Sequence, residues 1–198
     1  MKEIIFATYN EDKLKEITTI MAGMSSRLIS VKNAGYDIEI IEDGTTYIEN
    51  ATKKARAILE LSGKPTMSDD SGVEIDFLGG EPGLNASTYL TTNDNYKERN
   101  KKILEMLADA TGAQRKAAYV CTIALFLPNG DKYFTEGRLE GEIATEPKGS
   151  DGFAYDEIFY IPHLGKTLAE LSIQEKNKIS HRNIALQKML KILKEFGL

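Results

Sequence analysis

The sequence SDDSGVEIDFLGGEPG occupies residues 68–83. Val73, Ile75 and Phe77 alternate with charged residues, the period-2 pattern of a strand with one buried face. Two adjacent carboxylates, Asp69 and Asp70, come directly before the predicted strand, and a glycine-rich turn follows it. Because neighbouring residues of an extended backbone point to opposite faces, at most one of these carboxylates is expected to face a given cleft, unless the chain bends there.

The adjacent carboxylates have two interpretations. Like charges placed this close repel each other, and one common use of such a pair is to bind a divalent cation. Alternatively, the segment is a polar turn before a strand, in which Asp and Ser side chains bond the local backbone. The stretch by itself is compatible with both.

Composition limits the classes of protein to consider. The chain has 198 residues, enough for one domain with a sizeable core, or for one domain with two lobes. The formal net charge of −5 argues against a sequence-independent grip on long nucleic acid, which needs a basic surface, but it does not exclude a small anion. Cys121 is the single cysteine, so neither an intrachain disulfide nor a cysteine-built metal site is expected. No basic-then-apolar leader and no apolar run of membrane-spanning length is found, so we expect a cytoplasmic protein.

A strand, a tight turn and a helix are predicted at the beginning of the chain. The apolar run within 2–8 suits a buried strand, and Asn10 can cap a helix over 11–21. Helix N-termini offer N–H groups to anions, and Thr8, Asn10 and Lys13 add side-chain donors. An ordinary capped turn is the alternative interpretation.

Thr46 and Glu49 have the spacing of a capping box for a helix that reaches about Leu61 and ends at Gly63. Asn50 and Lys54 are four residues apart and therefore share a face of this helix. Because helical lysines are mostly solvated, Lys54 is predicted to be solvated. Further elements are predicted as a strand at 28–31, a helix at 94–110, strands at 116–127 and 131–143 joined by an Asn-Gly turn, a strand at 153–161 and a final helix at 180–196.

A set of motifs in one order covers nearly the whole chain. They are TYNEDK at 8–13 with Glu16, ENA at 49–51 with Lys54, DDSG at 69–72, GFAYD at 152–156, KTLAEL at 166–171 and EKNKISHR at 175–182. In these motifs the chain resembles the inosine triphosphate pyrophosphatases, also called non-canonical purine nucleoside triphosphate (dITP/XTP) pyrophosphatases.

The resemblance implies a fold and a reaction. The fold is a single elongated α/β domain over 1–198, with two lobes, a long bent mixed sheet and a central nucleotide cleft. The reaction is Mg²⁺-dependent hydrolysis of (d)ITP and XTP to the monophosphate and pyrophosphate, and the implied assembly is a homodimer.

The resemblance also implies residue roles by position. Phosphates would be held by Thr8, Tyr9, Asn10, Glu11, Asp12 and Lys13, the metal by Glu42 and Asp70, the nucleotide also by Ser71, and the base by Phe153, Ala154, Tyr155, Asp156, Lys176, His181 and Arg182. Asp70 and Lys54 would carry the chemistry, with Asp70 orienting or deprotonating the attacking water and Lys54 neutralising the triphosphate. Arg182 has only hydrogen-bond donors, so it can bind a 6-oxo purine and cannot satisfy the 6-amino group of adenine. In the alternative, Arg182 only caps or pairs locally on its helix.

Several positions depart from the family pattern. Tyr9 stands where glycine is frequent, Ala154 replaces a glycine, Glu157 replaces a proline, and Thr88 replaces an arginine. These differences bear on substrate range and rate more than on reaction type. Two alternatives to this function remain. In these, the chain is either a catalytically weak regulatory module that binds nucleotides, or a Maf-type pyrophosphatase that acts on other modified nucleotides. The SHR sequence at 180–182 favours the purine branch.

Overall fold

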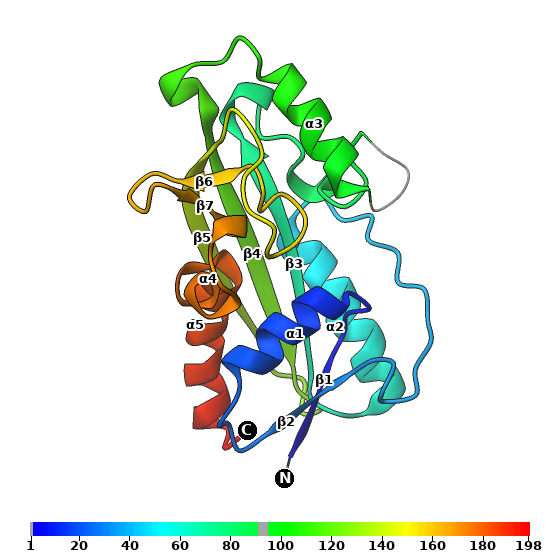
Figure 1. Cartoon of the computed structure of the whole chain (residues 1–198). Coiled ribbons are helices and arrows are strands. Elements are labelled where there is room, and N and C mark those ends of the chain that lie inside the picture. Colours follow the sequence, from blue (N-terminus) through cyan, green and yellow to red (C-terminus); the bar gives the residue numbers. More distant parts are fainter. Residues whose placement is uncertain (1, 91–94) are drawn as a thin grey trace. The chain divides into compact units, whose positions relative to one another are not determined.

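The computed structural model describes residues 2–90 and 95–198, which form a mixed α/β fold (Figure 1). The strands are β1 (Glu3–Phe6), β2 (Arg27–Ser30), β3 (Thr66–Ile75), β4 (Lys116–Phe126), β5 (Lys132–Ile143), β6 (Phe159–Ile161) and β7 (Lys166–Thr167). The α-helices are α1 (Glu11–Ile20), α2 (Tyr47–Ser62), α3 (Tyr96–Met106), α4 (Ile173–Ile179) and α5 (His181–Glu195). Short 3₁₀ segments are η1 (Asp76–Leu78), η2 (Gly83–Asn85), η3 (Gly112–Arg115) and η4 (Leu168–Glu170).

The strands form one seven-stranded sheet in the order β2-β1-β3-β4-β5-β6-β7. β1 runs parallel to both β2 and β3, whereas β6 runs antiparallel to β5 and β7. The sheet is therefore mixed, as predicted. Among the described residues, no helix is both long and apolar enough to cross a membrane.

The chain divides into two compact units, each assembled from separate stretches of sequence. Unit 1 comprises the chain up to Asp70, Cys121–Gly137 and His181–Leu198, and unit 2 comprises Ser71–Val120 and Arg138–Ser180. Each unit has a hydrophobic core of its own. In unit 1, Phe6, Met67 and Ile123 pack with the inner face of α5, and in unit 2 a second core forms around buried aromatic side chains of 119–159.

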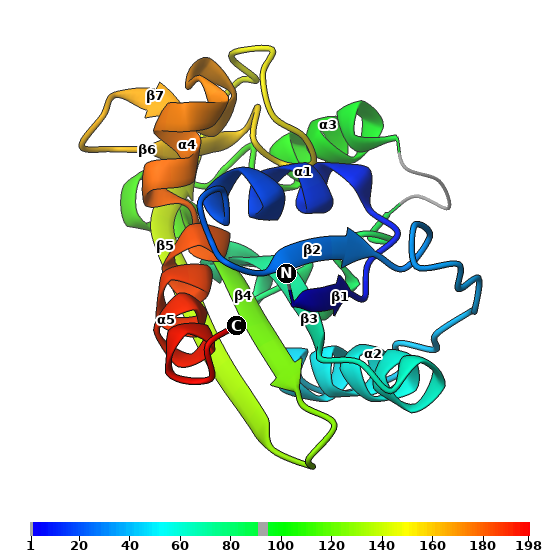
Figure 2. The ribbon, with the colours of Figure 1, turned by 90° about the horizontal axis from the view of Figure 1, so that it is seen from below.

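Helix α5 packs closely on β5 within unit 1, a contact that the views in Figures 1 and 2 both show. A Cβ atom built on Gly137 would lie 2.0 Å from the backbone oxygen of His181. The hydroxyl of Thr135 donates a hydrogen bond of 2.9 Å to the backbone oxygen of Ala185. This close approach needs glycine at 137, and it fixes the first turn of α5 against the sheet.

The helix boundaries agree with the capping signals in the sequence. Asn10 caps α1 and Thr46 caps α2, each by accepting a hydrogen bond from the backbone N–H three residues later. Gly63 ends α2 in the left-handed conformation, with φ of 62°. The predicted start of α3 at Asp94 lies outside the described residues, and the helix begins at Tyr96 after an Asn95 cap. It ends at Met106, so the end predicted at 110 was wrong.

Two predicted strands had wrong boundaries. β3 begins at Thr66, so Asp69 and Asp70 lie inside the strand instead of before it, and Phe77 belongs to η1. The strand is longer because its first residues pair in parallel with β1, through Phe6 and Met67. The strand predicted over 153–161 is limited to β6, because Ala154 adopts φ of 57°, which no β-strand accommodates.

Candidate active site

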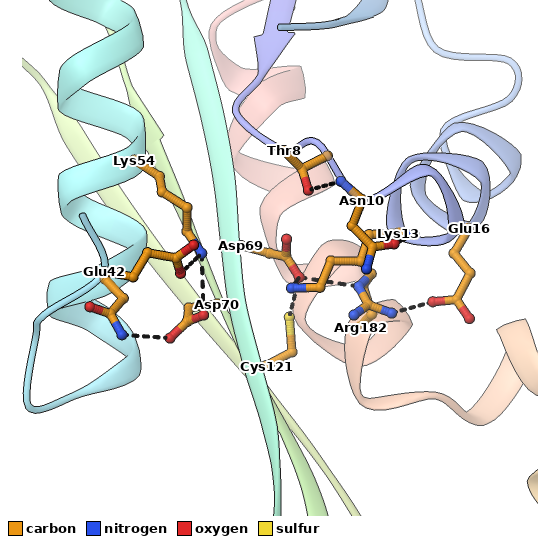
Figure 3. Close-up of polar contacts among 11 residues, drawn as sticks. Thr8, Asn10, Lys13, Glu16, Glu42, Lys54, Asp69, Asp70, Cys121 and Arg182 are labelled. Atoms are coloured by element: carbon orange, nitrogen blue, oxygen red, sulfur yellow. Dashed lines mark hydrogen bonds and ion pairs between the residues drawn. The ribbon is translucent and has the colours of Figure 1, made fainter. Parts of the chain in front are cut away.

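Asp69 and Asp70 leave β3 on opposite faces and contact different partners (Figure 3). Asp70 contacts groups on α2, and Asp69 contacts groups on α1 and α5. This separation confirms the alternation argument from the sequence. The two carboxylates therefore have separate environments.

A buried lysine lies against Asp70. The Lys54 ammonium is 3.2 Å from Asp70 Oδ1, and it also pairs with the Glu42 carboxylate. Asn50 Nδ2 donates a hydrogen bond of 3.2 Å to Asp70 Oδ2. Lys54 is only 7% exposed, so its predicted solvation was wrong. Its helix face is covered by Asp70 and by the segment that carries Glu42, neither of which is visible in the helical pattern.

The charges on this face shift each other's pKa. Burial raises the pKa of the Asp70 carboxyl, and the nearby Lys54 ammonium opposes that shift without cancelling it. Burial alone would lower the pKa of Lys54, but Asp70 and Glu42 outweigh burial and raise it. Lys54 thus stays charged, and Asp70 is a carboxylate with increased affinity for a proton. That combination suits a group that accepts a proton from water beside a fixed positive charge.

The opposite face of β3 holds a buried cluster of charges. Asp69 is 3.2 Å from Lys13 Nζ and 3.3 Å from Arg182 Nε, and Arg182 also pairs with Glu16. Burial by itself would raise the pKa of Asp69, but Lys13 and Arg182 overcome this and hold the pKa well below its ordinary value. Asp69 therefore remains ionised and fixes the position of both cations.

Arg182 is 1% exposed and has protein carboxylates among its acceptors. The base-reading role predicted for Arg182 rests on its having only hydrogen-bond donors, for which a 6-oxo group is one possible acceptor. Glu16 and Asp69, on other elements of unit 1, already supply acceptors. Base reading by Arg182 stays a prediction, and its pairing is not local to α5.

The turn between β1 and α1 is braced by its own side chains. Thr8 Oγ1 accepts a hydrogen bond of 3.2 Å from the N–H of Asn10, and Asn10 Oδ1 accepts one of 3.0 Å from the N–H of Lys13. Glu11 and Asp12 are exposed in the first turn of α1. The predicted phosphate-binding turn is thus a preformed capped turn, and of its side chains Lys13 carries the positive charge.

In unit 2, Asp156 organises the loop predicted to frame the base. Asp156 Oδ2 accepts hydrogen bonds from the N–H of Phe153 at 2.9 Å and from Lys176 Nζ at 2.6 Å. Lys176 Nζ also lies 4.5 Å from the centroid of the Phe153 ring. The Tyr119 hydroxyl accepts a hydrogen bond from the N–H of Tyr155. These contacts bring together the predicted residues of 153–156 with Lys176.

The remaining predicted residues are placed as follows. Ser71 is half-buried on β3 in unit 2, and His181 is buried at the start of α5 in unit 1. Sequence reasoning gave no role to Asn50, Asp69 or Glu16, which all contact the predicted site residues. The available signals were the four-residue spacing of Asn50 and Lys54 and the presence of Asp69 and Glu16 in the motifs.

The residues that could hold a metal are few. Among the described residues, no group of three or more His, Cys, Asp or Glu side chains forms a metal site. Glu42 and Asp70 nevertheless converge on one cation, the Lys54 ammonium. Mg²⁺ binds through one or two carboxylates together with waters and substrate phosphates. The donor set of two carboxylates therefore fits Mg²⁺ brought in with a phosphorylated substrate.

Comparisons with known proteins match nearly the whole chain to one family. The sequence model of the Ham1 family matches residues 4–192. A dITP/XTP pyrophosphatase from Halalkalibacterium halodurans is 44% identical over 98% of this chain and 100% of its own length. One from Clostridium perfringens is 39% identical over 98% of both chains.

Solved structures give the same result. A HAM1 protein from Coxiella burnetii superposes with a TM-score of 0.88 at 41% identity, covering 98% of this chain and 100% of that one. The Ham1 protein of Staphylococcus aureus superposes with a TM-score of 0.87 at 34% identity, covering 98% and 99%.

Proposed function

This chain belongs to the Ham1 family, and we propose that it hydrolyses (d)ITP and XTP to the monophosphate and pyrophosphate. The names of the curated relatives support the reaction and the substrate class. The structural observation that carries the proposal is the buried Asp70, which lies 3.2 Å from the Lys54 ammonium, a cation that it shares with Glu42. A module that only binds nucleotide has no need for such a proton acceptor.

In the proposed reaction, a water molecule attacks the α-phosphorus and gives a proton to Asp70. The bond from the α-phosphorus to the bridging oxygen breaks, and pyrophosphate leaves. Lys54 offsets the negative charge that collects on the phosphates, while Lys13 and the turn of 8–13 hold them. Asn50 holds Asp70 in place through its amide. Mg²⁺, held by Glu42 and Asp70 when bound, would supply further charge stabilisation.

Base choice is assigned to the loop of 153–156, Lys176 and Arg182. The loop of 153–156 and Lys176 offer an aromatic ring, backbone groups and a charged amine, which suit a purine. Arg182 is retained as a candidate reader of the 6-oxo group. Guanine carries the same group, so Arg182 alone does not explain selection against GTP.

A nucleotide panel tests the proposal. Purified protein should release pyrophosphate, and no single orthophosphate, from ITP, dITP and XTP, and it should leave ATP largely intact. Omission of Mg²⁺ should abolish the release. The product is identified by a phosphate assay with and without added inorganic pyrophosphatase. Orthophosphate in the absence of that enzyme, or equal turnover of ATP, would contradict the proposal.

A homodimer and a single functional domain, both implied by the family resemblance, complete the proposal together with the cytoplasmic location expected from the sequence. Analytical ultracentrifugation at several protein concentrations tests the dimer. A single species at the monomer mass of 22.0 kDa across that range would contradict it.

A further inference from the structure

The Tyr9 side chain makes a two-way hydrogen bond to a residue 29 positions away. Its hydroxyl donates to the backbone oxygen of Ile38 at 3.0 Å and accepts from the backbone N–H of Ile38 at 2.9 Å. A hydroxyl that both donates to and accepts from one residue restrains that residue more than a single bond does. Tyr9 as a whole residue is 48% exposed, so burial in a core does not place it there.

Tyr9 is anchored on a rigid support. It lies between Thr8 and Asn10, whose side chains bond the backbone of the same turn, and α1 starts two residues later. Ile38, in contrast, lies in the coil that connects β2 to α2. This coil runs beside α2, back toward the first turn of that helix (Figures 1 and 2).

The coil carries Glu42. Before Ile38 its hydrogen bonds stay within 30–36, and its other polar attachments lie beyond Ile38. Asp43 pairs with Lys53, and Gly44 N–H donates a hydrogen bond of 2.8 Å to Asn50 Oδ1. Each of these attachments is to α2. Ile41, between Ile38 and Glu42, is 70% exposed and contributes little packing. Among the described residues, the side-chain hydrogen bonds between this coil and the turn of 8–13 are thus the two that the Tyr9 hydroxyl makes.

We propose that Tyr9 is a positioning residue. It holds the Glu42 carboxylate where it pairs with Lys54, the same cation that pairs with Asp70. The hydroxyl fixes Ile38, and only three residues separate Ile38 from Glu42, so the bond limits how far Glu42 can move. The inference rests on the proposed function insofar as Glu42 helps to hold Mg²⁺. Removing the Tyr9 hydroxyl should therefore raise the Mg²⁺ concentration needed for half-maximal rate more than it raises the KM for the nucleotide.

A different role for Tyr9 is a steric one, in which the ring narrows the space around the phosphates. The two roles separate in Tyr9→Phe, which keeps the ring and removes only the hydroxyl. Tyr36→Phe is the matched control. Tyr36 lies in the same coil, and its hydroxyl makes no hydrogen bond with any residue of 2–90 and 95–198.

The first readout is amide hydrogen exchange in the metal-free protein without nucleotide. In Tyr9→Phe, peptides that cover 37–43 should exchange about 3- to 10-fold faster, the change expected from losing one or two hydrogen bonds. Tyr36→Phe should exchange like the wild type over that segment. Unchanged exchange of 37–43 in Tyr9→Phe would overturn the proposal.

The second readout is a Mg²⁺ titration of pyrophosphate release. Tyr9→Phe should raise the Mg²⁺ concentration for half-maximal rate about 3- to 10-fold, with KM for ITP at saturating Mg²⁺ within about twofold of wild type. In a Glu42→Gln background, Tyr9→Phe should have no further effect on the Mg²⁺ response, because its effect passes through Glu42. A change confined to the KM for ITP, or full additivity in the double variant, would overturn the proposal.

The proposed function can fail separately. If the wild-type protein releases no pyrophosphate from any nucleotide, the proposed function is wrong, and the exchange comparison still decides whether the Tyr9 hydroxyl restrains the coil.

Discussion

Asp69 and Asp70 are chemically identical neighbours, and strand β3, which carries both, points their side chains into different environments. Asp69 is enclosed by two cations, and Asp70 shares one cation with Glu42. Burial raises the pKa of Asp70, whereas at Asp69 the two cations overcome burial and lower the pKa. The same substitution at the two positions therefore separates a chemical effect from a structural one.

We expect Asp70→Asn to reduce kcat for ITP by about 10²-fold or more while nucleotide binding stays measurable, because an amide cannot accept the proton. Asp69→Asn, assayed as folded protein, should reduce kcat much less. Steady-state kinetics and a nucleotide-binding titration on both variants, checked by circular dichroism, measure this. Equal loss of kcat in the two folded variants would show that both carboxylates take part in the chemistry.

The lowered pKa of Asp69 predicts how stability depends on pH. Because the pKa is lower in the folded than in the unfolded state, Asp69 stabilises the fold fully above its unfolded pKa of about 3.9, and this stabilisation is lost as the pH falls further. The free energy of unfolding of the metal-free protein should thus fall more steeply below about pH 4 in wild type than in Asp69→Asn. Urea unfolding at a series of pH values measures both slopes, and parallel curves would contradict the assignment.

We expect the thiol of Cys121 to react slowly in the folded protein. The side chain is fully buried, and burial together with the nearby Asp69 raises the pKa of the thiol to about 12. Since the thiolate is the reactive species, iodoacetamide should leave Cys121 unmodified in the folded protein at pH 8 and modify it rapidly in 6 M guanidinium. Mass spectrometry follows the reaction. Rapid alkylation without denaturant would mean that β4 opens readily at this position.

For individual residues, the sequence predicted the direction in which a side chain points better than it predicted which residues that side chain contacts. The opposite orientation of Asp69 and Asp70 follows from strand geometry alone, and it was confirmed. The burial of Lys54 and the pairing of Arg182 with Glu16 depend on contacts between residues far apart in sequence. Such contacts produce no periodic signal, so only the motifs of the resemblance pointed to these residues.

For helices and strands, local sequence signals predicted α1 and α2 but did not predict the first half of β3. Caps and stop residues act on backbone groups a few positions away, so the limits of α1 and α2 were predicted to within a residue or two. The first half of β3 has no alternating pattern, because both of its faces are buried between other elements. Its existence depends on pairing with β1, which lies some sixty residues earlier in the chain.

The cap of α2 provides a test at this scale. Thr46 Oγ1 accepts a hydrogen bond of 3.2 Å from the N–H of Glu49. Thr46→Ala should lower the free energy of unfolding by about 1 kcal/mol. The control is Thr52→Ala, which removes the same atoms from the interior of α2 and should change stability by less than about 0.5 kcal/mol. Urea denaturation measures both variants, and equal effects would show that the Thr46 bond does not stabilise α2.

At the scale of the molecule, ligand binding should be visible as stability. A ligand that binds only the folded state at 100 times its Kd adds about 2.7 kcal/mol, or about 5–10 °C in Tm for a chain of this size. With Mg²⁺, the non-hydrolysable α,β-methylene analogue of ITP should give such a shift, and the matching ATP analogue should give a much smaller one. Equal shifts would mean that the protein does not select the base at the binding step.

The division of the chain into interleaved stretches affects how it is synthesised. The core of unit 1 joins residues of β1 and β3 to apolar side chains of α5, and α5 is translated after every other helix and strand. While a ribosome is producing unit 2, the apolar side chains of β1 and α1 lack the partners that α5 supplies, and they remain open to chaperones or to aggregation. A chain stopped at Ser180 should accordingly be recovered in inclusion bodies, although it contains every strand of the sheet.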